Sequence, residues 1–250
     1  MDQELKAPFS RVGGKRSLKT TLYRLFPSEF KTYVEPFVGG GSVFMGYKFP
    51  EGVKAVLNDK DSDLMMAYKS LKNAKNPEFY KQYDTNDIKR LTAMKDGSNP
   101  LLKQIAKSGT FNSKGLKGGK IYNTASPWRI LKDADKYREK LKGVTLTSSD
   151  YGAVISAYNR PGVFMYLDPP YEGSDDGGGL YKEGGGFNYE NLAKRLRGFK
   201  GKFMLSLNDS SNIRNLFKGF KIRGVSINQS ARWQKGEGRK NRKELIITNY

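Results

Sequence analysis

The chain has 250 residues, a formal net charge of +20, and neither cysteine nor histidine. The two absences exclude disulfides, zinc sites built on those residues, a thiol nucleophile and an imidazole base. Any catalysis must therefore rest on carboxylates, amides, hydroxyls, lysines and the backbone. The positive charge favours an acidic polymer as partner, most commonly nucleic acid, with a general solubility bias as the alternative.

The length fits one large α/β domain, or a domain with a sizeable insertion. No apolar run approaches the roughly 20 residues of a membrane span. The first residues, Met1 to Glu4, do not read as a secretory signal. We therefore expect a cytoplasmic protein without a membrane partner.

The first predicted element is a helix after Lys15, ended by Pro27. Its apolar residues recur at helical spacing: Leu18, Leu22, Leu25 and Phe26. The triplet Gly13-Gly14-Lys15 before it lacks the spacing of a phosphate-binding loop. Taken alone it is weak evidence for a ligand site, and a surface turn with a solvated lysine is the alternative.

A strand beginning near Tyr33 runs into three glycines, Gly39 to Gly41, and then into an amphipathic helix. Glycines let the backbone approach a ligand, and a helix start offers amide donors. A second strand, 53–57, is followed by Asp59, 20 residues after Gly39. At about this separation an acid meets ribose hydroxyls in dinucleotide-binding folds, which indicates a nucleoside-bearing cofactor. The alternative is that Asp59 caps the helix beginning near Asp61.

A helix over 61–73 packs on the sheet, and the composition then changes between 76 and 143. Basic residues mix there with aromatic ones, and 114–120 is a loop of glycine and lysine. Cations neutralise phosphates, and polar and aromatic groups reach bases, so this segment is predicted to bind nucleic acid. A helical subdomain with a solvated basic face is the alternative.

The αβ pattern resumes with a third strand, 144–147, and a helix, 151–158. Asp150 stands between them, where it could bind an amino group of a cofactor base or cap the helix. The fourth strand, 163–167, is an uninterrupted apolar run.

Asp168-Pro169-Pro170-Tyr171 follows this strand and ends it, because prolines cannot donate to a sheet ladder. Open α/β sheets place ligand sites at this carboxyl edge. A rigid carboxylate, a backbone carbonyl and an aromatic plane suit a planar base that bears an amino group. The alternative is a strand end followed by a proline turn.

Segment 172–188 contains seven glycines and is a candidate lid, with a plain flexible loop as the alternative. A helix over 189–198 and strands over 203–207, 221–227 and 244–248 complete the chain. Residues 232–243, with six basic residues and one acid, are predicted to turn a hairpin into the last strand. A basic hairpin tip suits phosphate contact.

Seven strands, one insertion, a glycine loop, a spaced acid and the Asp-Pro-Pro-Tyr motif occur here in a fixed order. This combination resembles the Dam-type DNA adenine methyltransferases over nearly the whole chain. The resemblance implies a Rossmann-like α/β methyltransferase fold with a mostly parallel seven-stranded sheet. It also implies a catalytic domain formed by 1–75 and 144–250, and a small, mainly helical target-recognition subdomain at 76–143.

The resemblance implies methyl transfer from S-adenosylmethionine to the exocyclic amino group of an adenine flipped out of double-stranded DNA, without a metal, by a monomer or weak dimer. Restriction–modification is one expected context. The implied catalytic residues are Asp168, Pro169, Pro170 and Tyr171. Those implied for the cofactor are Lys15, Glu35, Phe37, Gly39, Gly41, Ser42, Asp59, Asp150, Tyr151 and Asp168. Those predicted for DNA are Phe111, Asn112, Lys114, Lys117, Lys120, Tyr122, Asn123, Trp128, Arg232, Lys235 and Arg239.

Two departures concern the target sequence. Arg11 stands where the family usually has tryptophan, and the recognition loop lacks an identifiable arginine and proline that GATC-reading relatives carry. Three other functions remain open: amino-methylation of cytosine in DNA, methylation of a base in RNA, and non-catalytic DNA binding. Methylation of the cytosine ring carbon is excluded, because it proceeds through a cysteine.

Overall fold

The computed structural model describes residues 4–9, 15–74, 81–82, 90, 93–94, 96–110, 132–172, 186–228 and 241–250. The chain forms two compact units. The first unit consists of 1–14, 39–48 and 59–148, and the second of 15–38, 49–58 and 149–250. The division of the chain at 76 and 143 stays a prediction.

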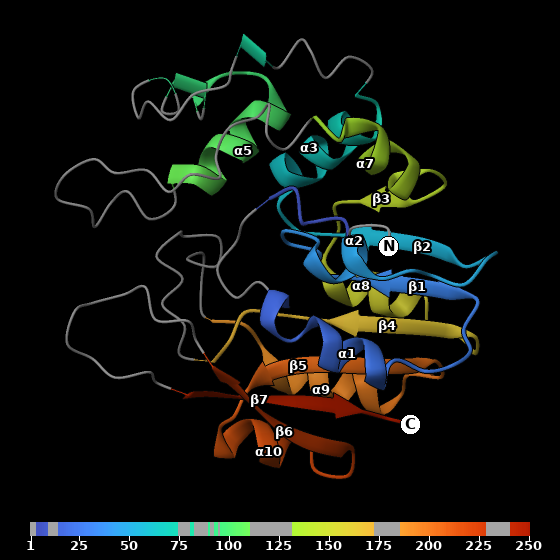
Figure 1. Cartoon of the computed structure of the whole chain (residues 1–250). Coiled ribbons are helices and arrows are strands. Elements are labelled where there is room, and N and C mark those ends of the chain that lie inside the picture. Colours follow the sequence, from blue (N-terminus) through green and yellow to red (C-terminus); the bar gives the residue numbers. More distant parts are fainter. Residues whose placement is uncertain are drawn as a thin grey trace, which may run out of the picture. The chain divides into compact units, whose positions relative to one another are not determined.

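The strands of the described residues form one seven-stranded sheet in the order β3-β2-β1-β4-β5-β7-β6 (Figure 1). Their bounds are β1 Thr32–Glu35, β2 Lys54–Asn58, β3 Thr145–Thr147, β4 Val163–Leu167, β5 Lys202–Asn208, β6 Lys221–Asn228 and β7 Asn241–Thr248. β1 is parallel to β2 and β4, and β4 is parallel to β5. β7 runs antiparallel to both β5 and β6. The predicted seven-stranded, mostly parallel α/β sheet is confirmed.

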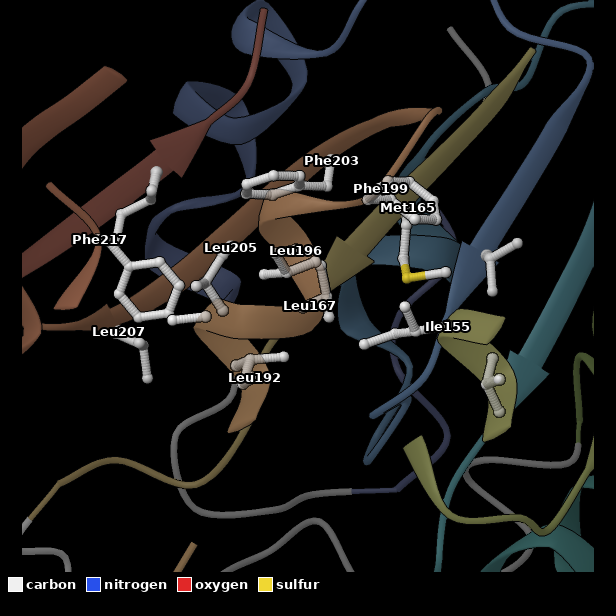
Figure 2. Packing of buried hydrophobic residues seen from close by; sticks show 14 of the residues in the cluster. Ile155, Met165, Leu167, Leu192, Leu196, Phe199, Phe203, Leu205, Leu207 and Phe217 are labelled. Carbon is white, nitrogen blue, oxygen red and sulfur yellow. The ribbon is translucent and has the colours of Figure 1, made fainter. Parts of the chain in front are cut away.

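All five residues of β4 are buried, because both faces of this strand are covered. Val163, Met165 and Leu167 belong to the core cluster that helices α8 (Tyr151–Ala157), α9 (Tyr189–Arg197) and α10 (Ser211–Leu216) build with the sheet (Figure 2). Phe164 points to the other face, where its ring lies 4.7 Å from that of Phe26. Phe26 caps the carboxyl end of α1 (Lys19–Leu25), which follows the short 3-10 helix η1 (Lys15–Ser17).

The first unit contains α2 (Ser42–Gly46), α3 (Ser62–Lys72), α5 (Pro100–Thr110), α7 (Ala134–Leu141) and the strand β3. α3 begins after Asp61, whose carboxylate accepts a hydrogen bond from the Leu64 amide at 3.1 Å. On one face α3 buries Leu64, Met65, Ala67, Tyr68 and Leu71. The Asp63 carboxylate ties α3 to α5 through Lys103 at 3.0 Å, and this lysine lowers the pKa of Asp63.

Candidate active site

Asp168 follows directly after β4 and is held by two side chains of the same unit. The Lys15 ammonium lies 2.6 Å from its Oδ1 oxygen, and the Ser206 hydroxyl donates to that oxygen at 3.1 Å. The Lys15 side chain is 2% exposed, whereas that of Asp168 is 20% exposed. A largely buried carboxylate with a remaining opening can accept hydrogen bonds from a ligand.

Burial raises the pKa of Asp168, while the charge of Lys15 and the hydrogen bonds from Lys15 and Ser206 lower it. Ser206 also shares a hydrogen bond with the Tyr166 hydroxyl at 2.9 Å. Because Ser206 has a single hydroxyl hydrogen, donation to Asp168 makes Tyr166 the donor to Ser206. The resulting chain, Tyr166 to Ser206 to Asp168, gives both hydroxyl groups a hydrogen-bond acceptor.

Tyr171 is 9% exposed and belongs to the core cluster of the second unit. The Lys15 ammonium lies 4.6 Å from the centroid of its ring, within the range of a cation–π contact. Burial raises the pKa of Tyr171 strongly, and the charges of Asp168 and Glu244 add to this. The phenol therefore stays neutral, and the ring presents a hydrophobic plane beside the carboxylate.

The glycine loop lies in the first unit, between β1 and α2. Gly39 and Gly41 have φ angles of +48° and +74°, which side-chain-bearing residues rarely adopt. The Gly39 amide donates to Oδ2 of Asp59 at 2.9 Å, and the Asp61 amide donates to its Oδ1 at 3.0 Å. Asp59 therefore braces the glycine loop, and Asp61 is the residue that caps α3. Ser42 is the first residue of α2.

The other four residues expected at the cofactor lie in the second unit. Glu35 is 2% exposed, and its carboxylate accepts a hydrogen bond from the Tyr33 hydroxyl at 2.8 Å. Asp150 accepts one from the Gly152 amide at 2.8 Å and caps α8, which was the alternative considered for it. The rings of Phe37 and Tyr151 lie 5.4 Å apart. A cofactor role for these four residues stays a prediction.

The residues predicted to contact DNA lie outside the part of the chain that the structure describes. They fall in 111–131 and 229–240. The paired residues Asn228 and Asn241 show that β6 and β7 lead into and out of the second of these segments, as the predicted hairpin requires.

Three residues beside the Asp168-Pro169-Pro170-Tyr171 motif are not among the predicted site residues. Tyr189 donates from its hydroxyl to the Pro170 carbonyl at 2.6 Å, and Asn208 bonds the backbone of Glu172. Glu244 is 4% exposed on β7. The sequence predicts a last strand that begins at 244, whereas β7 begins at Asn241 and Glu244 lies buried within it.

Within the described ranges, no group of three or more acidic residues could hold a metal ion. None of the helices there is long and apolar enough to cross a membrane.

The strand order, with an antiparallel last strand between β5 and β6, and the acid at the end of β4 define a Rossmann-like methyltransferase. A model of the D12 class N6 adenine-specific DNA methyltransferase family matches residues 12–99 and 101–229. The chain belongs to this family and is an adenine-specific DNA methyltransferase, as its resemblance to the Dam type indicated.

Three relatives match over almost their whole length. The chain is 26% identical to a type II methyltransferase, M1.LlaDCHI, of Lactococcus lactis, covering 97% of this chain and 95% of the relative. It is 27% identical to M.MjaIII of Methanocaldococcus jannaschii (99% and 100%) and 26% identical to a DNA adenine methylase of Vibrio cholerae (94% and 92%). A solved precorrin 8W decarboxylase of Methanobacterium thermoautotrophicum is 9% identical with a TM-score of 0.41, covering 98% of this chain and 95% of that one. The fold is assigned from the strand order and not from this structural similarity.

Proposed function

We propose that Asp168 and Pro169 bind and activate the exocyclic amino group of an adenine that has been flipped out of double-stranded DNA. The observation that carries this role is the position of the Lys15 ammonium. A nitrogen donor lies 2.6 Å from Asp168 and over the ring of Tyr171. A base stacked on Tyr171 would bring its amino group to a similar position, next to the Asp168 carboxylate. The second oxygen of this carboxylate can accept a hydrogen bond from the amino group.

The amino nitrogen of adenine is a poor nucleophile, because its lone pair is delocalised into the ring. In the proposed mechanism Asp168 accepts one amino hydrogen and the Pro169 carbonyl accepts the other. These two bonds favour a pyramidal nitrogen with a localised lone pair. The amine becomes acidic only as it is methylated, so positioning and charge stabilisation suffice and no imidazole base is needed.

S-adenosylmethionine supplies an electrophilic methyl group on a sulfonium centre. The glycine loop of this chain is suited to hold such a cofactor. A side-chain carbon placed at Gly39 would meet nothing within 4 Å, so a ligand can approach the backbone there. Asp59 stands at this loop with a carboxylate for ribose hydroxyls. We assign Lys15, Glu35, Phe37, Gly41, Ser42, Asp150, Tyr151 and Asp168 to the same cofactor.

Duplex DNA hides the adenine amino group, so the base must leave the stack, at a cost of a few kcal/mol. The net charge of +20 supports binding to phosphates, as do the predicted contacts from Phe111 to Trp128 and from Arg232 to Arg239. We further propose that the enzyme works in the cytoplasm as a monomer or weak dimer.

Methyl transfer from labelled S-adenosylmethionine to unmethylated plasmid DNA tests this function, with the modified positions mapped by single-molecule sequencing. Methyladenine at one short motif supports the proposal and defines the target. Label in cytosine, or in RNA only, would favour one of the alternative substrates.

The variant Asp168→Ala tests the residue assignment. It should abolish turnover while calorimetry still detects S-adenosylmethionine binding. Turnover retained in this variant would exclude the proposed role of Asp168. A wild-type chain that binds DNA but neither binds the cofactor nor transfers a methyl group would be a non-catalytic DNA-binding protein.

A further inference from the structure

We propose that Tyr189, Asn208 and Glu244 are positioning residues that fix the plane of Tyr171 for stacking on the target base. This inference rests on the proposed function, in which the ring of Tyr171 receives the flipped adenine. The three residues come from α9, the end of β5 and the start of the apolar part of β7. All belong to the second unit, together with the catalytic motif.

Tyr189 fixes the peptide that precedes Tyr171. Its hydroxyl donates to the Pro170 carbonyl at 2.6 Å. Its own ring is supported by Phe187, with 5.0 Å between the two centroids. The rings of Pro169 and Pro170 already set φ at both positions. The bond from Tyr189 therefore orients the one carbonyl group between the second proline and Tyr171. This hydrogen bond occupies the carbonyl oxygen of Pro170, whereas the proposed mechanism uses the carbonyl oxygen of Pro169.

Asn208 fixes the residue that follows Tyr171. Its Oδ1 accepts a hydrogen bond from the Glu172 amide at 3.0 Å, and its Nδ2 donates to the Glu172 carbonyl at 3.2 Å. The Glu172 carboxylate in turn accepts bonds from Ser210 at 2.5 Å and Asn212 at 2.6 Å. The backbone is thus held on both sides of Tyr171, which restricts the direction in which its side chain leaves the chain.

Glu244 lies beside Asn208 in the sheet. It pairs with Asn208 in the register of β5 and β7, so both side chains project from the same point of the sheet. Its carboxylate is buried, and its charge adds to the effect of burial in raising the pKa of Tyr171. Glu244 therefore lies at the same edge of the sheet as Asn208, which holds the residue that follows Tyr171.

A fixed ring matters because methyl transfer depends on alignment. A displacement of about 1 Å in a reacting group can lower a rate about a hundredfold. Two other residues of the same unit, Tyr250 and Asn249, make the same kinds of side-chain-to-backbone hydrogen bond. Their variants can therefore serve as matched controls. The Tyr250 hydroxyl donates to the Leu25 carbonyl at 2.8 Å. Asn249 accepts from the Phe203 amide and donates to the Gly201 carbonyl, each at 2.9 Å.

The experiment compares Tyr189→Phe with Tyr250→Phe, and Asn208→Asp with Asn249→Asp. Glu244→Gln is compared with wild type. Each protein is assayed for methyl transfer to DNA carrying the mapped target site. Fluorescence of 2-aminopurine at the target position reports stacking, because stacking quenches it. Calorimetry reports binding of S-adenosylmethionine.

We expect Tyr189→Phe, Asn208→Asp and Glu244→Gln to lower kcat about tenfold or more and to raise 2-aminopurine fluorescence in the DNA complex. Cofactor affinity should stay within about twofold of wild type in these variants, because the bonds that they remove lie at Tyr171. The two controls should keep both the wild-type kcat and the wild-type fluorescence. Equal effects in the controls and the test variants, or no effect in the test variants, would overturn the inference.

Tyr171→Ala separates this inference from the proposed function. If Tyr189 acts through the Tyr171 ring, Tyr189→Phe should cost nothing further in the Tyr171→Ala background. A full additional loss there would show that Tyr189 acts by another route and overturn the inference alone. A Tyr171→Ala enzyme as active as wild type would overturn the stacking role itself.

Discussion

The Lys15 ammonium bridges Asp168 and Tyr171, lying 2.6 Å from the carboxylate and 4.6 Å from the ring centroid. One cation from the start of η1 therefore contacts both chemical groups that follow β4. Removing one partner of a buried ion pair leaves the other charge uncompensated. Lys15 consequently controls how readily Asp168 stays ionised.

Lys15→Met should move the pH dependence of turnover. Burial already raises the pKa of Asp168, and Lys15 is the first of the groups that oppose this. Without the lysine the pKa of Asp168 rises further, so the neutral acid persists to higher pH and cannot accept the amino hydrogen. The acidic limb of a kcat–pH profile should shift upward. Lys15→Arg, which keeps the charge, should shift it less, and an unmoved limb in Lys15→Met would contradict this account.

Ser206→Ala should impair both stability and catalysis. It leaves the buried Tyr166 hydroxyl without the partner it has at 2.9 Å, which costs about 1–3 kcal/mol of unfolding free energy. It also removes a hydrogen bond that lowers the pKa of Asp168. The double variant Tyr166→Phe/Ser206→Ala should recover much of the stability but not the kcat. Denaturant unfolding and methyl-transfer kinetics measure the two effects, and recovery of both together would argue against the link to Asp168.

Gly41→Ala should be more harmful than Gly39→Ala. Both positions have positive φ angles, so alanine is strained at either one. At Gly41 the added carbon would also lie 2.4 Å from the Tyr68 hydroxyl, which is itself bonded to the Gly39 carbonyl. Thermal unfolding and S-adenosylmethionine titration test the ranking. Gly143→Ala, where φ is +70° and the space is open, is the control for strain alone.

Lys140 should make stability rise in mildly alkaline solution. Burial lowers the pKa of this lysine from 10.5 to about 8, while its ammonium lies over the Phe44 ring. Between these two pH values the unfolded chain binds more protons than the folded one, so unfolding free energy increases with pH. Over the whole of this pH range the gain is about 3 kcal/mol. Lys140→Met should lack this rise in unfolding curves recorded from pH 7.5 to 10.5, and a rise of equal size in the variant would refute the assignment.

The sequence predicted the sheet well because each strand has a local signal. The apolar run 163–167 between breakers matches β4 to the residue. The short helix α10 lacked such a signal and was not expected, since only Ile213 of its six residues is buried. Asp59 and Asp150 each allowed a capping alternative, and the structure distinguishes them. Asp150 caps its helix, whereas Asp59 instead receives the Gly39 amide.

The surroundings of Tyr171 could not be predicted from local patterns. Asn208 lies 36 residues from Glu172, and Tyr189 lies 19 residues from Pro170. A polar side chain that bonds a distant backbone leaves no periodicity in the sequence. Its role becomes visible only when the strands are placed side by side.

The antiparallel strand β7 lies between β5 and β6, which do not pair with each other. During synthesis β5 and β6 therefore lack the strand that joins them until residues 241–248 have been made. Until that point β5 has an unpaired edge. Glu244 arrives on the same late strand. A nascent or truncated chain that lacks β7 would thus hold the Asp168 motif with Tyr189 and Asn208 but without Glu244, so the closing of the sheet also completes the set of residues proposed to position Tyr171.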